Sequence, residues 1–193
     1  MLPGHSSAII DGRLLAVLNG FLDPPYSVRG MQLLFRASRD GFEAAEFHRR
    51  CDNWGPTVVL ARSNGGYIFG GFTESVWDSS SSWKPGEKNF LFRLDGPAGG
   101  RATVASAFMP SKHTYFRNQG VEKAIGCFSD TGPCFGAGDN GASTDLWILP
   151  PYEPSLAIAA LGTSYTQHSS SGTHALLAEA TRVTLSDWEV FGL

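Results

Sequence analysis

The stretch that decides the fold is residues 33–72, LLFRASRDGFEAAEFHRRCDNWGPTVVLARSNGGYIFGGF. Its apolar opening predicts a short strand at 33–36. The dipeptide Asp40-Gly41 then predicts a tight turn, because glycine adopts backbone conformations that other residues avoid. The spacing of apolar residues after the turn predicts a helix of about three turns at 42–51.

The second part of this stretch predicts two paired strands. Residues 57–61 are β-branched or apolar at every position, which is typical of a strand that is covered on both faces. The dipeptide Asn64-Gly65 is the strongest hairpin signal in the sequence. Residues 66–72 are therefore expected to return as the antiparallel partner of 57–61.

On the N-terminal side, residues 8–21 are predicted to form an amphipathic helix that docks on the main body. Ser6 or Ser7 is the expected cap, and Asn19-Gly20 the expected end. The apolar residues that recur at helical spacing are Ile10, Leu14, Val17, Leu18 and Phe21.

On the C-terminal side, short apolar runs alternate with turn residues about every ten positions. Residues 74–88 are expected to form a loop. Strands are expected at 89–94, 102–108, 124–128, 134–135, 145–149, 176–184 and 188–193. This pattern predicts an α+β fold that is mostly β, a two-layer antiparallel β-sandwich flanked by two short helices. We expect one domain over residues 1–193, with its core at about 6–193.

Composition excludes several classes of protein. The 193 residues carry a net charge of −3 without a basic block, so no nucleic-acid partner is expected. No apolar run approaches 20 residues, so no membrane span is expected. Residues 1–13 lack the basic start and apolar run of a secretory signal. The sequence thus predicts a monomer in the cytoplasm.

Three cysteines, Cys51, Cys127 and Cys134, are too few and odd in number for a disulfide framework. A single Cys127–Cys134 bridge and three reduced thiols are both open, and the reduced state suits a reducing compartment. Direct scavenging of oxidants through a thiol is a further hypothesis. It requires at least one exposed cysteine in electropositive surroundings.

No cofactor or metal site is predicted. Residues 136–141, GAGDNG, match G-x-G-x-x-G formally, but a strand rather than a helix is expected after them, so they lack the context of a dinucleotide site. His48 and Cys51 stand three positions apart on one predicted helix, as metal ligands can. No second pair with zinc spacing accompanies them.

A catalytic hypothesis rests on the polar residues of the deciding stretch. Ser38, Asp40, His48 and Asp52 include the residue types of a nucleophilic triad, and Cys51 adds a thiol. A hydrolase-like or thiol-based enzyme built on Ser38, Asp40, His48 and Cys51 would hold these side chains within hydrogen-bonding reach in a cleft. No Gly-x-Ser-x-Gly elbow supports it.

An interaction surface is the alternative interpretation of the same region. Arg36, Arg39, Asp40 and Asp52 form a dense charge cluster at the start of a helix, where Asp40 can act as cap. Arg36 or Arg39 is expected to pair with Asp52. The cluster is either a structural salt-bridge network or a surface that a partner contacts.

Tryptophans in polar segments are the other candidate contacts. Most aromatic residues lie in apolar strand patterns and are assigned to the core. Trp54, Trp77 and Trp83 instead lie in polar loops, and we expect them to be exposed. Trp77 and Trp83 join Arg36, Arg39, Asp40, His48 and Asp52 as candidate structural or partner-contact residues.

The run Leu33–Phe42 resembles the TLDc domain. Matching landmarks then follow in order: Phe47-His48, Cys51-Asp52, Gly55-Pro56-Thr57, Gly66–Thr73, Trp83, Phe90-Leu91-Phe92, Asp145–Ile148, Leu161–Tyr165 and Trp188–Phe191. The resemblance covers roughly residues 6–193. Pro150-Pro151 and Ala175–Ala180 depart from the family pattern.

The resemblance implies a β-sandwich with flanking helices and a role linked to protection from oxidative damage. Several members of the family bind the vacuolar proton-pumping ATPase and regulate its assembly, so subunits of that ATPase are the implied partners. No catalytic residue set comes with the resemblance. The expected function is therefore a non-enzymatic protein-interaction module, either as a stand-alone protein or as a domain of a larger one.

Overall fold

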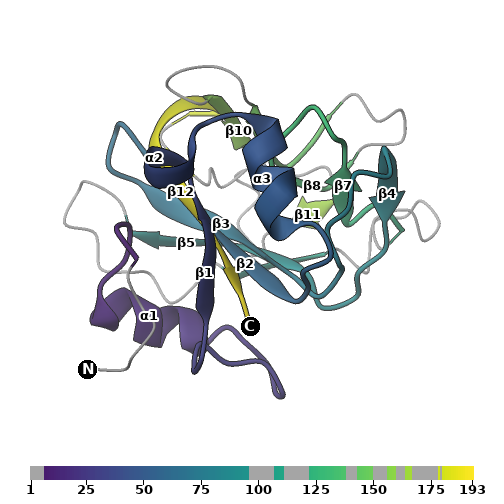
Figure 1. Cartoon of the computed structure of the whole chain (residues 1–193). Helices are drawn as coiled ribbons and strands as arrows, with labels where there is room; N and C mark the ends of the chain where they lie inside the picture. Colours follow the sequence, from purple (N-terminus) through teal and green to yellow (C-terminus); the bar gives the residue numbers. More distant parts are fainter. Residues whose placement is uncertain are drawn as a thin grey trace.

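The computed structural model describes residues 7–95, 107–110, 122–137, 143–149, 156–159, 164–166, 178 and 180–193. Within them the chain is mostly β, with antiparallel strands and three short helices (Figure 1). The predicted fold class is confirmed, with one helix more than expected. No described helix has the length and apolar character needed to cross a membrane. The predicted strand positions 102–106, 176, 177 and 179, and positions 138–141 of the glycine-rich loop, lie outside the described residues.

Helix α1 (Gly12–Asn19) is shorter than the predicted helix at 8–21, and its cap is Asp11 rather than Ser6 or Ser7. Asp11 Oδ1 accepts a hydrogen bond from Leu14 N–H at 2.9 Å. Ser7 Oγ instead accepts from the N–H groups of residues 9 and 10, which holds this segment in a turn ahead of the helix. The predicted end at Asn19-Gly20 is correct.

The turn after β1 (Gln32–Arg36) contains a helix that the sequence did not predict, α2 (Ala37–Asp40). Gly41, at φ 102°, ends α2, a conformation that side-chain-bearing residues rarely adopt. Helix α3 (Ala44–Cys51) therefore begins two residues later than predicted, and Phe42 lies outside it.

The remaining strands are β2 (Thr57–Ser63), β3 (Ile68–Thr73), β4 (Ser82–Lys84), β5 (Phe90–Asp95), β6 (Ala107–Pro110), β7 (Ile125–Cys127), β8 (Cys134–Phe135), β9 (Leu146–Leu149), β10 (Leu156–Ala159), β11 (Tyr165–Thr166) and β12 (Arg182–Gly192). Their order is β11-β6-β5-β3-β2-β12-β10-β9-β8-β7-β4, and β1 pairs with β12. The predicted β2–β3 hairpin is confirmed. β4 lies in the segment predicted as a loop, and β10 and β11 were not predicted.

Strand β12 joins the two halves of the sheet. Its C-terminal part lies between β1 and β2, whereas its first residues pair with β10. The sequence predicted two separate strands here. They are one strand because Ser186, between Leu185 and Asp187, forms an irregularity in the register with β2 rather than a break.

The first half of the sheet, β1, β2, β3, β5 and the C-terminal part of β12, is covered on both faces, as predicted from β2. Val58 and Leu60 point to one side and pack with the apolar residues of α1, whereas Val59 and Ala61 point into the larger core. This alternation follows from the period of two along a strand. Figure 1 shows α1 lying beside this half of the sheet.

The larger core is shared by both halves of the sheet. Phe135 of β8 lies so close to Gly71 of β3 that a Cβ atom at position 71 would come within 2.7 Å of its ring. Phe135 also meets the ring of Trp77, edge to face, at 5.8 Å. Side chains from the two halves are therefore in direct contact, and stacking in two layers remains a prediction.

Candidate functional site

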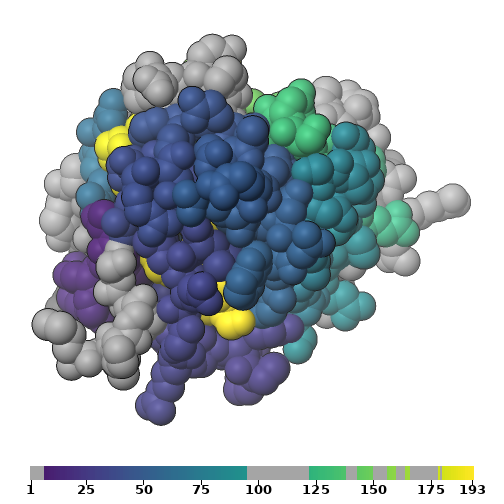
Figure 2. All heavy atoms as spheres, viewed as in Figure 1, coloured from purple at the N-terminus to yellow at the C-terminus, as the bar shows by residue number. Residues whose placement is uncertain are grey.

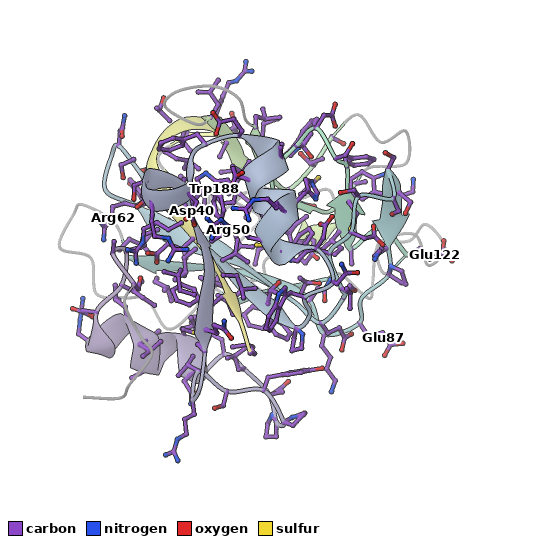
Figure 3. The ribbon with its side chains drawn as sticks, in the orientation of Figure 1. Asp40, Arg50, Arg62, Glu87, Glu122 and Trp188 are labelled. Atoms are coloured by element: carbon purple, nitrogen blue, oxygen red, sulfur yellow. The ribbon has the colours of Figure 1, made fainter. Side chains whose placement is uncertain are left out.

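Asp40, the last residue of α2, is the centre of a charged cluster between β1 and the helices (Figure 3). Its carboxylate accepts hydrogen bonds from Arg39 Nε and Nη2 at 2.8 and 2.7 Å and from Arg36 N–H at 2.9 Å. Arg50 Nη2 lies 3.1 Å away. Burial of the Asp40 side chain, which is 4% exposed, opposes its ionisation, but these hydrogen bonds and positive charges hold its pKa below the usual value.

A second carboxylate, Glu189 of β12, is fully buried and was missed by the sequence analysis. Arg36 Nε donates to it at 2.6 Å, Ala8 N–H at 2.8 Å and Ser7 Oγ at 2.5 Å. Glu189 therefore fastens the segment before α1 to β1. Arg62 donates a further hydrogen bond to the carbonyl of residue 9 in the same segment.

A third carboxylate, Asp187, holds the start of α2. Both the N–H and the hydroxyl of Ser38 donate to it, at 3.0 and 2.6 Å. The only sequence signal that marks Asp187 and Glu189 as functional candidates is that they are charged residues within an otherwise apolar strand. Nothing in their spacing indicates that they face Ser38 and Arg36.

His48 of α3 is buried and lies among acceptors. Nδ1 is 2.8 Å from Asp52 Oδ1, and Nε2 is 2.8 and 3.0 Å from the carbonyl oxygens of Phe128 and Thr131. The other oxygen of Asp52 accepts from Ser79 Oγ at 2.7 Å. His48 thus links α3 to two loops. The predicted pairing of Asp52 with Arg36 or Arg39 is wrong, because both arginines bind other carboxylates.

The residues of the catalytic hypothesis are not assembled. Ser38 bonds to Asp187, Asp40 to arginines and His48 to Asp52, so the imidazole of His48 is not bonded to the hydroxyl of Ser38. Cys51 is fully buried, and desolvation raises its pKa well above the usual value. The hydrogen-bonded set that an enzyme of this kind requires is absent from these side chains.

The thiol-scavenging hypothesis also lacks the exposed cysteine that it requires. All three cysteines are free and buried. Burial raises the pKa of Cys127 to about 11 and that of Cys134 still further. The pairing of Gly126 with Cys134 puts the side chains of Cys127 and Cys134 on opposite faces of the strand pair, which disfavours a bridge.

Trp77 is not a surface contact, and its prediction as an exposed residue is wrong. The side chain is fully buried, and its Nε1 donates to Thr57 Oγ1 at 2.8 Å. It therefore serves the core. Trp83 of β4 is partly exposed and meets Phe128 edge to face at 5.2 Å. Trp54 is 40% exposed.

Among the charged candidates, Arg39 has the most exposed side chain. It is 44% exposed, compared with 17% for Arg36 and 22% for Asp52. The exposed Arg49 of α3 lies on the same pair of helices and is paired with Glu46 at 2.6 Å. The surface over α2 and α3, which we call the helix surface, therefore presents the guanidinium groups of Arg39 and Arg49. Figure 2 shows this part of the chain, in dark blue, on the face of the molecule turned to the viewer.

Two kinds of comparison bear on this arrangement. The family model of the TLDc domain matches residues 4–193. The MTOR-associated protein MEAK7 of Danio rerio is 33% identical over 63 residues, which is 33% of this chain and 14% of the relative. MEAK7 of Mus musculus is 25% identical over 91 residues, 47% of this chain and 20% of the relative. The matched parts thus span a fifth or less of these relatives.

Proposed function

The chain belongs to the TLDc domain family, and on that premise we propose that it is a non-enzymatic protein-interaction module that binds its partner through the helix surface. It acts as a cytoplasmic monomer. Arg39 is the central contact, and the buried residues Asp40, His48 and Asp52 hold the surface in shape without touching the partner.

The observation that carries this proposal is the fixed orientation of Arg39. Its guanidinium binds Asp40 through two parallel hydrogen bonds, and Asp40 is itself held by Arg36 N–H and Arg50. An arginine held in this way loses little conformational entropy on binding. It therefore offers a partner a positive group in a defined place.

We propose the vacuolar proton-pumping ATPase as the first partner to test, in a response to oxidative stress, because members of the family bind it. The MEAK7 relatives are described as MTOR-associated, which makes an mTOR-containing complex the second partner to test.

The test is recovery of both complexes from cell extract at moderate salt with immobilised wild type, Arg39→Ala and Arg29→Ala. Arg29→Ala removes one exposed positive charge in the turn before β1, outside α2 and α3. We expect Arg39→Ala to lose the partner and Arg29→Ala to keep it. Equal recovery by all three proteins of matched stability, or recovery by none, contradicts the proposal.

A further inference from the structure

His48 is a buried titratable residue whose ring meets hydrogen-bond acceptors on both sides. The residue is 6% exposed. Its Nδ1 lies 2.8 Å from a carboxylate oxygen of Asp52, and its Nε2 lies 2.8 and 3.0 Å from the carbonyl oxygens of Phe128 and Thr131. A neutral imidazole has one N–H donor and one lone pair, whereas an imidazolium has two donors. A neutral ring would therefore turn a lone pair toward an oxygen atom on one side.

The partners of the ring cannot remove this conflict. The two backbone carbonyls only accept hydrogen bonds. The second oxygen of Asp52 accepts a hydrogen bond from Ser79 Oγ at 2.7 Å, so the carboxylate is held in place from both of its sides. The contacts of His48 are thus all satisfied when both ring nitrogens carry a proton.

The two carbonyls belong to a tight turn between β7 and β8, residues 128–131, which we call the carbonyl turn. Thr131 N–H closes the turn by donating to the carbonyl of Phe128 at 3.1 Å. The next residue, Gly132, donates its N–H to the carbonyl of Ile148 in β9, also at 3.1 Å. His48 therefore fastens α3 to the second half of the sheet.

The elements packed around His48 carry other charged and titratable side chains. The charged ones are bound to a partner of opposite charge or are exposed, and the thiols stay protonated because burial raises their pKa. They are Arg49 and Arg50 (bound to Glu46 and Asp40) on α3, Asp78 (bound to Lys84) before β4, Asp130 (exposed) in the carbonyl turn, and the thiols of Cys51 and Cys127. Asp52 is therefore the charged group that acts on the ring directly.

We infer that His48 is a proton-dependent clamp between α3 and the carbonyl turn. While the ring carries two protons, Nδ1–H donates to Asp52 and Nε2–H donates to the two carbonyls. When the pH rises and the ring gives up one proton to solvent, the negative charge of Asp52 keeps the remaining N–H at Nδ1. Nε2 then turns its lone pair toward the carbonyl oxygens, and the carbonyl turn is released from α3.

The clamp does not rest on the proposed function, because it is a property of the chain without a partner. It does bear on the helix surface, since α3 also carries the exposed Arg49. The pH would thereby act on how firmly α3 is fastened to the rest of the molecule.

The experiment follows the ring nitrogens of His48 and the amide of Thr131 by NMR as the pH is raised. We expect both nitrogens to be protonated at the acidic end of the range in which the chain stays folded. Nε2 should then lose its proton while Nδ1 keeps its own. Over the same range, the protection of the Thr131 amide from hydrogen exchange, relative to the unfolded chain at each pH, should fall about tenfold or more.

Asp52→Asn is the variant that separates a clamp from ordinary packing. Its amide oxygen still accepts from Ser79, and its amide nitrogen donates to Nδ1, so a neutral ring keeps its N–H on Nε2. The carbonyl turn should then stay protected across the whole pH range. Asp130→Asn makes the same chemical change at the exposed carboxylate of the turn, and it should keep the pH dependence of wild type.

Three results would each overturn the clamp. In the first, the Thr131 amide stays equally protected while Nε2 loses its proton. In the second, Nδ1 rather than Nε2 loses its proton. In the third, Asp52→Asn keeps the pH dependence of wild type. The first two are measured on the unmodified chain, so they decide the matter even if Asp52→Asn does not fold.

Discussion

At the scale of single residues, three buried carboxylates accept most of the hydrogen bonds that hold residues 36–40 in place. Asp40, Asp187 and Glu189 each bind groups from a different element, so they fix α2 and the N-terminal segment against the sheet. Each oxygen has a donor, which is the condition under which a buried charge is tolerated. The exposed side chain of Arg39 is in turn held in place by its hydrogen bonds to Asp40.

Replacing Glu189 by alanine is expected to be strongly destabilising. The change removes the buried carboxylate that accepts hydrogen bonds from Arg36, Ser7 and Ala8, and breaking a buried pair in this way costs about 3–5 kcal/mol. Urea denaturation measures the free energy of unfolding. Glu46→Ala, which removes an exposed pair with Arg49, is the control and leaves the midpoint nearly unchanged. Equal effects of the two changes contradict the assignment.

The contribution of Asp40 to stability is expected to depend on pH. Because its pKa is lower in the folded than in the unfolded chain, its ionised form favours folding; this contribution is complete above the unfolded pKa and is lost as the pH falls through the folded pKa. The free-energy difference between wild type and Asp40→Asn should therefore shrink from about pH 6 to about pH 2.5. A constant difference over this range is the contradictory result.

The cysteines are expected to resist modification in the native protein. Burial and the raised pKa values, about 11 for Cys127, keep the thiols protonated and out of reach at neutral pH. Mass spectrometry after mild peroxide treatment should find unmodified cysteines in the folded chain and modified ones in urea. Rapid native oxidation of Cys127 or Cys134 would restore the scavenging hypothesis.

At the scale of elements, two glycines are expected to respond to alanine in opposite ways. A Cβ at Gly71 would come within 2.7 Å of the Phe135 ring, so Gly71→Ala should cost about 1–3 kcal/mol. A Cβ at Gly12 meets nothing within 4 Å at the start of α1, so Gly12→Ala should stabilise by about 0.5–1 kcal/mol. Thermal denaturation compares them. A tolerated alanine at Gly71 contradicts the close contact between the two halves of the sheet.

The elements that the sequence predicted well are those with a strong local signal. The β2–β3 hairpin follows from Asn64-Gly65, and the two-sided burial of β2 follows from its unbroken apolar run. Helix α2 was missed because it has only four residues and depends on the contact of Ser38 with Asp187, far away in the sequence. β12 was divided in the prediction because a bulge and a turn look alike in sequence.

The site was harder to predict than the fold, because it depends on contacts between residues that are far apart in the sequence. The candidates in residues 36–52 were identified from their local density of charge, and Asp40 does lie at the centre of the cluster. Its contact with Arg50 depends on how α3 packs beside α2, and the contacts of Glu189 and Asp187 with residues 36 and 38 depend on the pairing of distant segments, neither of which spacing reveals. Exposure also depends on tertiary packing, which is why Trp77 was placed on the surface.

At the scale of the whole molecule, the described residues form a closely packed scaffold. The charged candidates Arg36, Arg39, Asp40 and Asp52 are each held by a hydrogen-bonded partner, and apolar layers lie on both faces of the first half of the sheet. The proposed interaction would use the shape and charge of the helix surface. For a surface held in this way, we expect binding without large rearrangement.

The most direct test of the interaction account is a contact map of the chain with its recovered partner, from hydrogen exchange and cross-linking of the free and bound protein. We predict protection and cross-links over residues 37–50, centred on Arg39, with the buried core unchanged. A bound partner that leaves the helix surface unprotected would contradict the account.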